Sequence, residues 1–140
     1  MNEYGRRIII DRDFDVALTD LTNAMRAEGV DVITRFDVRR FLSERLHRDF
    51  RRYALLQVSP PQVLLDGLRT DLDVGPVLPA PIAVYELADG ETAIEVGEAF
   101  GAVSDDAGWR KRMPEMAALA DAEHDRIGRA LARLAALASV

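Results

Sequence analysis

The sequence predicts an α+β fold with the order strand, helix, strand, helix, strand, helix, strand, strand, helix. Short runs rich in β-branched residues alternate with segments of helical spacing. Asp89 and Gly90 join two apolar runs as a tight turn does, and apolar residues keep the helical period over roughly the last 25 residues. At 140 residues the chain fits one domain, residues 1–140, with its own core.

The first strand is predicted at residues 6–11, RRIIID, because β-branched side chains favour a pleated surface. Asp13 is placed to cap the helix that follows, and Gly29 is placed to end it. Residues 30–38 then alternate in hydropathy, which is the period of a half-buried strand. The first helix is indicated by apolar residues at helical spacing: Ala17, Leu18, Leu21, Ala24 and Met25.

A short helix is expected next, with a single stripe formed by Phe41, Leu42, Arg45 and Leu46. Residues 52–58 read as the third strand, which Pro60 and Pro61 end because proline lacks the amide hydrogen of a strand ladder. Proline suits the first turn of the next helix, whose buried side is Val63, Leu64 and Leu68. Ser59 therefore lies at a strand-to-helix junction, where a hydroxyl commonly caps exposed amides.

Residues 73–81 are expected to be irregular, and residues 82–96 form the clearest hairpin signal in the chain. With Asp89 and Gly90 as the central turn residues, Ala88 faces Glu91, Tyr85 faces Ile94 and Val84 faces Glu95. That register predicts a core face of Ala83, Tyr85, Leu87, Thr92, Ile94 and Val96. The other face is mixed and contains Ile82, Val84, Glu86, Glu91, Ala93 and Glu95.

Residues 97–108 form a loop of glycine and small residues that is a candidate lid. Pro114 fits the first turn of a terminal helix of about 25 residues, near 37 Å long. Acidic residues lie early in this helix and arginines late, as the helix dipole prefers.

Several classes of protein are disfavoured by composition. The chain has no cysteine, which excludes disulfides, thiolate nucleophiles and cysteine-ligated metals. The N-terminal segment has only three consecutive strongly apolar residues, Ile8 to Ile10, too few for a signal peptide or a membrane span. The net charge of −6 opposes nucleic-acid binding. We therefore expect a cytoplasmic protein with neither membrane nor nucleic acid as partner.

Positive charge gathers in residues 39–53, where six arginines stand against Glu44 and Asp49. This segment carries a net charge of +4, so the rest of the chain carries −10. Arginine forks onto carboxylate or phosphate, so the cluster can receive an anionic ligand or an acidic partner. The alternative is a surface ladder of ion pairs along Arg40, Glu44 and Arg48, which are spaced i, i+4.

Three phrases, VDVITRFDV, RRYALLQVSPP and VGPVLPAPIAVYE, resemble the domain-of-unknown-function 302 family over nearly the whole chain. The resemblance implies a curved antiparallel sheet of about five strands with helices on one face, similar in topology to half of the TATA-box-binding protein. It also implies a homodimer. Fold resemblance does not transmit function.

The chain departs from the family pattern at two places. The family has a cysteine followed by Asn-Pro where this chain has Ser59, Pro60 and Pro61. It has Leu-Pro-Cys-Asn where this chain has Leu78, Pro79, Ala80 and Pro81. A thiol, redox or metal role suspected for the family therefore does not map onto this chain.

Motifs for catalysis and cofactor binding are missing from the sequence. Ser59 lacks the flanking glycines of a nucleophile elbow. The histidines, His47 and His124, do not form a zinc motif, and the glycines at 97, 101 and 108 do not form a phosphate loop. We expect no metal and no cofactor.

Glu86 and Glu95 are the one candidate acid–base pair, as diagonal neighbours on the mixed face of the predicted hairpin. The alternative is a solvated stripe of glutamates without chemistry, and a register change of one residue would separate the pair.

We interpret the sequence as a homodimeric protein without catalysis that binds a small-molecule ligand or acts as an interaction module. Its candidate ligand-binding residues are Arg51, Arg52, Tyr53, Ser59, Glu86 and Glu95. The alternative is a small hydrolase or isomerase that uses Glu86 and Glu95 with Arg51 or Arg52.

Overall fold

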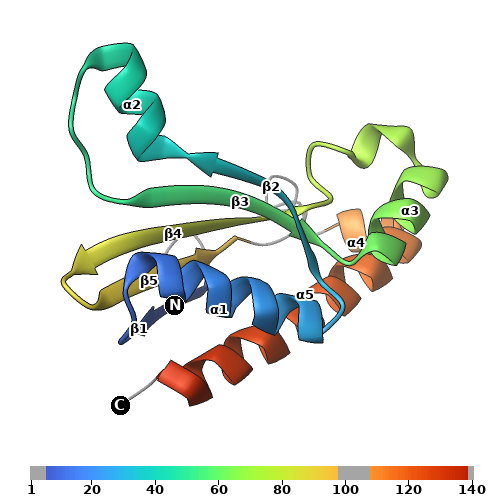
Figure 1. The fold of residues 1–140 in the computed structure, drawn as a ribbon. Helices are drawn as coiled ribbons and strands as arrows, with labels where there is room; N and C mark the ends of the chain where they lie inside the picture. The colour runs from blue at the N-terminus through green and yellow to red at the C-terminus, as the bar shows by residue number, and fades with distance from the viewer. Residues whose placement is uncertain (1–5, 98–107, 139–140) are drawn as a thin grey trace.

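A computed structural model describes residues 6–97 and 108–138 (Figure 1). Residues 98–107, most of the candidate lid, lie outside the described residues. The predicted order of elements is confirmed, with a short 3₁₀ turn (η1) and a four-residue helix (α4) in addition. The elements are β1 (Arg6–Ile10), α1 (Phe14–Ala27), β2 (Asp31–Asp37), α2 (Val38–Leu46), β3 (Tyr53–Ser59), α3 (Pro61–Thr70), η1 (Leu72–Val74), β4 (Ala80–Ala88), β5 (Glu91–Val96), α4 (Trp109–Arg112) and α5 (Pro114–Ala138).

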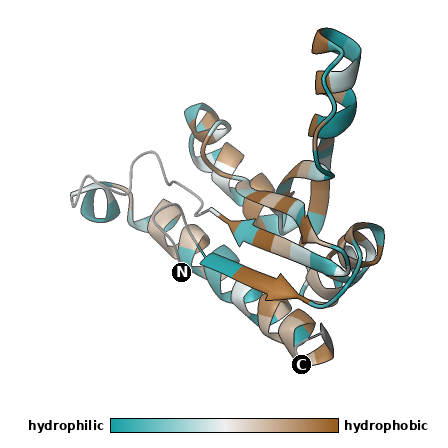
Figure 2. Cartoon of the chain, turned by 90° about the vertical axis from the view of Figure 1, so that its left-hand side faces the viewer, coloured by the Kyte–Doolittle hydropathy of each residue, from teal (hydrophilic) through white to brown (hydrophobic). Residues whose placement is uncertain are grey.

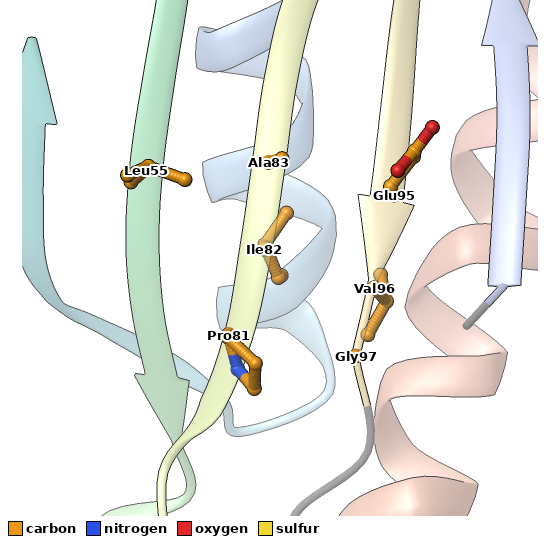
Figure 3. A pocket seen from close by; sticks show the side chains of 7 residues that line it. All are labelled: Leu55, Pro81, Ile82, Ala83, Glu95, Val96 and Gly97. Atoms are coloured by element: carbon orange, nitrogen blue, oxygen red, sulfur yellow. The ribbon is translucent and has the colours of Figure 1, made fainter. Parts of the chain in front are cut away.

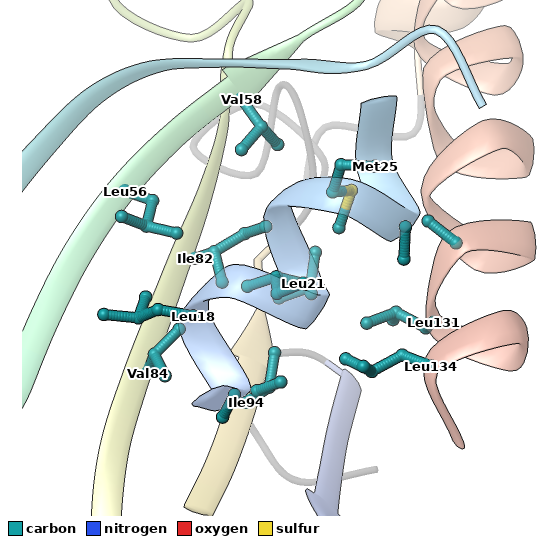
Figure 4. Close-up of a cluster of buried hydrophobic side chains, with 14 of the residues drawn as sticks. Leu18, Leu21, Met25, Leu56, Val58, Ile82, Val84, Ile94, Leu131 and Leu134 are labelled. Atoms are coloured by element: carbon teal, nitrogen blue, oxygen red, sulfur yellow. The ribbon is translucent and has the colours of Figure 1, made fainter. Parts of the chain in front are cut away.

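The strands form one antiparallel sheet in the order β1-β5-β4-β3-β2, with β1 and β2 at its edges. Helices α1 and α5 pack together on one face of this sheet (Figure 4). Leu21 and Met25 of α1 lie between the sheet and Leu134 of α5, and all three are fully buried. This is the face to which alternate residues of the strands point, so the sequence period of two is the origin of the core.

The ends of α1 follow the prediction only in part. Gly29 adopts a positive φ of 74°, the left-handed conformation in which glycine commonly ends a helix. Asp13 occupies the N-cap position, but its side chain makes no capping hydrogen bond, so that part of the prediction is wrong. Instead, Glu28 anchors this end of α1 to α5, since it accepts hydrogen bonds from Arg129 at 3.1 Å and Arg133 at 2.9 Å.

A second hydrophobic cluster joins α3, η1 and α4 to the first half of α5. Leu78 and Met116 are fully buried within it. The irregular segment before β4 ends two residues earlier than predicted, because Ala80 and Pro81 already pair with Val58 and Gln57 of β3.

The hairpin β4–β5 corrects the predicted register. Ala88 faces Glu91 as expected, but the register shifts between Glu86 and Ala88, and Glu86 faces Thr92. This is a β-bulge, in which Leu87 is the extra residue on β4. The residues of β4 before the bulge therefore lie on the opposite sheet face from the one predicted, while those of β5 lie on the predicted face. Ile82 and Val84 join the core with Ile94 and Val96, while Ala83 and Tyr85 point to the opposite face with Ala93 and Glu95.

Residues 33–52, which we call the arm, comprise most of β2, all of α2 and the segment leading into β3. Helix α2 stands away from the helices that cover the sheet and buries none of its residues (Figures 1 and 2). The predicted apolar stripe is present, yet Phe41 remains 43% exposed and Leu46 62% exposed. Figure 2 shows hydrophobic stretches along this helix, although none of its residues is buried.

Candidate functional site

The sheet face opposite α1 and α5, which we call the open face, carries an ordered row of side chains. One residue from each strand pairs with the next across the sheet: Phe36, Leu55, Ala83, Glu95 and Arg7. The row thus runs from an aromatic ring on the arm to an ion pair at the other edge. Figure 3 looks onto this face, with α1 and α5 behind the strands.

A hollow of about 200 Å³ lies on the open face at the middle of this row. Figure 3 shows the residues that line it: Leu55, Pro81, Ile82, Ala83, Glu95, Val96 and Gly97. Among these seven residues Glu95 alone has an ionisable side chain. The hollow therefore offers an apolar surface with one carboxylate at its rim.

A polar and aromatic network extends from Glu95 along the open face. The hydroxyl of Tyr85 donates a hydrogen bond of 2.6 Å to Oε1 of Glu95, and Nε of Arg7 lies 3.7 Å from the same oxygen. The ring of Tyr53 stacks on that of Tyr85, with centroids 5.1 Å apart and planes inclined by 7°. Phe50 on the arm continues the series, 6.4 Å from Tyr53.

Both tyrosines of this network are held in their protonated form. The hydrogen bond to Glu95, with a smaller contribution from burial, raises the pKa of Tyr85. Burial, and then the negative charge of Glu95, raises the pKa of Tyr53. At neutral pH the two phenols are therefore hydrogen-bond donors and stacking surfaces, and not nucleophiles or bases.

Two of the sequence-predicted site residues, Tyr53 and Glu95, come together here through Tyr85. The other candidates lie elsewhere. Arg52 pairs with Asp15 of α1 at 2.6 Å. The Arg52 guanidinium also lies 4.7 Å from the ring centroid of Phe14. Arg51 donates to the main-chain carbonyl of Glu86 at 3.3 Å.

Ser59 is buried, with 1% of its surface exposed, and its hydroxyl donates to the carbonyl of Pro60 at 3.1 Å. It does lie at the junction of β3 and α3, but Pro60 is the N-cap residue and α3 has no side-chain cap, so the capping role is wrong. Ser59 is also six residues from Tyr53 along an extended strand, about 20 Å away.

The predicted acid–base pair is not formed. Glu86 faces Thr92, so it lies on the sheet face that carries Ile94 and Val96. Glu95 faces Ala83 and lies on the open face. The bulge at Leu87 is the physical cause, because it inserts one residue between the turn and Glu86. This register does not support a hydrolase or isomerase that divides acid and base roles between the two carboxylates on one sheet face.

The arginines of residues 39–53 are largely engaged in local contacts. Arg40 and Glu44 form the predicted i, i+4 ion pair at 2.9 Å, and Arg39 pairs with Asp49 at 3.5 Å. The hydrogen bond to Glu44 raises the pKa of Arg40. Arg48 lies beyond the end of α2 at Leu46, so the predicted ladder is shorter than expected.

Two further structural observations concern ligands. Among residues 6–97 and 108–138, no group of three or more histidine, aspartate or glutamate side chains is placed to hold a metal ion. None of the helices within these ranges is long and apolar enough to cross a bilayer.

Sequence reasoning missed Tyr85 and Arg7. The bulge at Leu87 brings Tyr85 onto the face of Glu95, and it leaves no recognisable signal in the sequence. Arg7 faces Glu95 in the regular pairing of β1 with β5, which joins segments far apart in the chain and is not indicated by local pattern. Sequence reasoning also missed the burial of Glu123, which is fully buried on α5. Here a signal existed, since Glu123 follows Met116 by seven positions and precedes Ile127 by four, within the apolar stripe.

The sequence matches the family described as "Domain of unknown function DUF302" over residues 7–134. The chain belongs to the DUF302 family. Its fold is similar to the crystal structure of an uncharacterized conserved protein DUF302 from Bacillus stearothermophilus, with a TM-score of 0.69 and 25% sequence identity. The similarity covers 95% of this chain and 97% of that one. Among curated proteins, no relative matches this DUF302 chain.

Proposed function

We propose that this protein is a homodimeric binding protein without catalysis, whose open face holds one small ligand. The main observation behind this proposal is the hollow beside Glu95, an apolar depression with a single carboxylate at its rim. The ligand that fits this chemistry is a small organic cation, with an apolar ring or chain in the hollow and a positive group on Glu95.

The size of the hollow sets the size of the ligand. A dry cavity of about 150 Å³ admits a benzene molecule. The hollow of about 200 Å³ therefore admits one ring with a short substituent. Pro81 and Ala83 leave space above the sheet because neither side chain extends far from it.

The geometry of Glu95 sets the charge of the ligand. Its contacts with Tyr85 and Arg7 both use Oε1. Within the described part of the chain, Oε2 is the oxygen that remains to accept a hydrogen bond from a ligand. A hydrogen bond from an ammonium group to a carboxylate is stronger than one between two neutral groups.

The same geometry supports binding over catalysis. Tyr53 and Tyr85 stay protonated, and Glu86 lies on the other sheet face from Glu95. The homodimer is supported by the arm, whose helix buries no residue within a single copy.

Nuclear magnetic resonance titration with benzylamine and phenylacetate tests this proposal, since the two probes share a ring and differ in the sign of charge. We expect benzylamine to shift the amide resonances of Ala83, Glu95 and Gly97, and phenylacetate to leave them in place. Ala83→Leu, which fills the hollow, should abolish the benzylamine shifts. Ala88→Leu, at the exposed end of β4, is the matched control and should retain them.

Equal shifts with both probes, or shifts that persist in Ala83→Leu, would contradict the proposal. The first result would remove the role of Glu95, and the second would remove the role of the hollow.

A further inference from the structure

The arm carries an apolar surface that residues 6–97 and 108–138 leave exposed. Helix α2 has nine residues and none is buried. Isolated helices of this length are marginal in water, and helices in proteins draw most of their stability from packing an apolar face. Phe36 and Phe50 are as exposed as Phe41, so the apolar surface extends to both flanks of α2.

The apolar surface of the arm is continuous with the hollow. The rings of Phe41 and Phe36 are in contact, with centroids 5.3 Å apart. Phe36 pairs with Leu55 across β2 and β3, and Leu55, which is 45% exposed, borders the hollow. The arm and the hollow are thus the two ends of one surface. In a two-fold dimer the same patch of both copies meets, so a surface with an arm at one end and a hollow at the other can pair with itself, each arm on the hollow of the other copy.

The charge distribution favours a second copy of this chain as the occupant. Residues 39–53 carry +4 and the remainder of the chain carries −10. The arm of one copy and the remainder of another therefore attract each other by opposite net charge, while two arms repel each other by like net charge. This difference favours arm on body over arm on arm.

The exposed aromatic rings of the arm supply part of the area that a stable protein–protein interface buries. At about 200 Å² for each phenylalanine, the three half-exposed rings of the arm present roughly 250 Å². Each partner of a standard interface buries about 800 Å². The rings supply the central aromatic anchors of such an interface, and the arginines around them supply a charged rim.

We propose that two copies of this chain dock with the arm of each over the open face of the other, so that the partner's arm closes the hollow. This inference rests on the proposed function for the role of the hollow, but the docking itself does not. The open hollow becomes an enclosed site only in the dimer, and benzylamine therefore binds the dimer in preference to the monomer.

Charge substitution on the arm tests the docking. Phe41→Glu with Leu46→Glu should convert the dimer to a monomer in size-exclusion chromatography with light scattering. The fold should survive, as judged by circular dichroism, because neither side chain contacts the core. Leu72→Glu is the matched control: Leu72 is 82% exposed and outside the arm, and this variant should remain a dimer. A wild-type monomer, or a dimer that survives both arm substitutions, would overturn the proposal.

Cross-linking tests how the two copies are arranged. The cross-link can be directed to chosen positions because the chain has no cysteine of its own. Ser43→Cys places a thiol on α2, and Gln57→Cys places one on the open face next to Pro81. With a short bismaleimide, a mixture of the two variants should form more cross-linked dimer than Ser43→Cys alone. More product from Ser43→Cys alone would show arms packed on arms, and no product from any combination would exclude the docking.

The two proposals can fail separately. A dimer that gives the mixed cross-link but shows no benzylamine shifts would support the docking and contradict the proposed ligand binding. Benzylamine binding of equal strength in the monomeric arm variant would leave the ligand intact and remove the closure. At least a tenfold weaker affinity in that variant is the result expected.

Discussion

The hydrogen bond from Tyr85 to Glu95 is the best-defined polar contact of the open face. It fixes one carboxylate oxygen and holds the Tyr85 ring beneath that of Tyr53. A bond to an ionised acceptor is shorter and stronger than a neutral one, and 2.6 Å lies in the expected range. Glu95 is therefore a positioned group, fixed before any ligand arrives.

Replacing Glu95 with glutamine should lower the pKa of Tyr85, and that of Tyr53 by less. The carboxylate raises both pKa values, so the neutral phenols persist above pH 10.0, the ordinary tyrosine pKa. The stabilisation is complete below pH 10.0 and is lost as the pH rises through the raised pKa. Ultraviolet absorption of the phenolates, followed as pH increases, measures the change.

Glu91→Gln is the control for this titration, since Glu91 lies on the exposed end of the same hairpin. Its titration curve should coincide with that of the wild type. A Glu95→Gln curve that also coincides with the wild type would show that Tyr85 and Glu95 are not bonded in solution.

At the residue scale the sequence predicted about half of this site. Tyr53 and Glu95 could be selected because each lies on a recognisable strand with a polar or aromatic side chain. Tyr85 was placed on the core face, and Arg7 was not selected. The face of Tyr85 depends on the bulge at Leu87, which the Asp-Gly turn signal does not indicate. The position of Arg7 depends on the pairing of β1 with β5, two segments far apart in the chain.

Among the elements, α1 and α5 depend on each other at Glu28. Hydrogen bonds from Arg133 and Arg129 lower the pKa of this carboxyl below its ordinary value of 4.5. The resulting stabilisation is present above pH 4.5 and is lost as the pH falls through the lowered pKa.

Glu28→Gln should therefore have a lower melting temperature than the wild type at pH 7, and the difference should shrink as the pH falls below 4.5. Thermal unfolding followed by circular dichroism over a pH series measures this. A difference that stays constant with pH would show that packing, and not charge, links Glu28 to α5.

Gly67 of α3 packs tightly against Leu78 in the segment before β4. A Cβ atom at this position would lie 2.5 Å from Cδ2 of Leu78, which is fully buried. Gly67→Ala should destabilise the chain by about 1–3 kcal/mol through overpacking, offset in part by about 1 kcal/mol of helix propensity. Urea denaturation measures the free energy of unfolding.

Gly75→Ala is the matched control, because its added Cβ meets nothing closer than 3.9 Å. We expect no loss of stability there. A Gly67→Ala variant that is as stable as the wild type would show that Leu78 can shift at no cost.

At the scale of elements, the sequence predicted the strands and the helices because each has a strong local period. The period of α2 was also read correctly as an apolar stripe. What local pattern cannot indicate is the partner of that stripe. A stripe that packs on the core and one that faces outward have the same spacing, and only the placement of the arm in three dimensions separates them.

The described part of the molecule divides into a packed body and a surface that its residues leave exposed. One hydrophobic cluster holds α1 and α5 to one face of the sheet, and a second joins α3, η1 and α4 to α5. The hollow lies on the other face, next to the row that begins at Phe36 of the arm. The order of elements predicted the body. The exposed surface follows from the register of all five strands, which sets which residues meet in one row.

Hydrogen exchange of the wild-type chain over a series of protein concentrations is the most direct test, because it needs no substitution. In a single copy α2 buries no side chain, so its amides should open and exchange readily. If a second copy covers the arm, α2 exchange should slow as concentration rises, while α1, buried in both states, stays unchanged as the internal reference. Fast exchange of α2 at every concentration would contradict the covered arm and the closed site that depends on it.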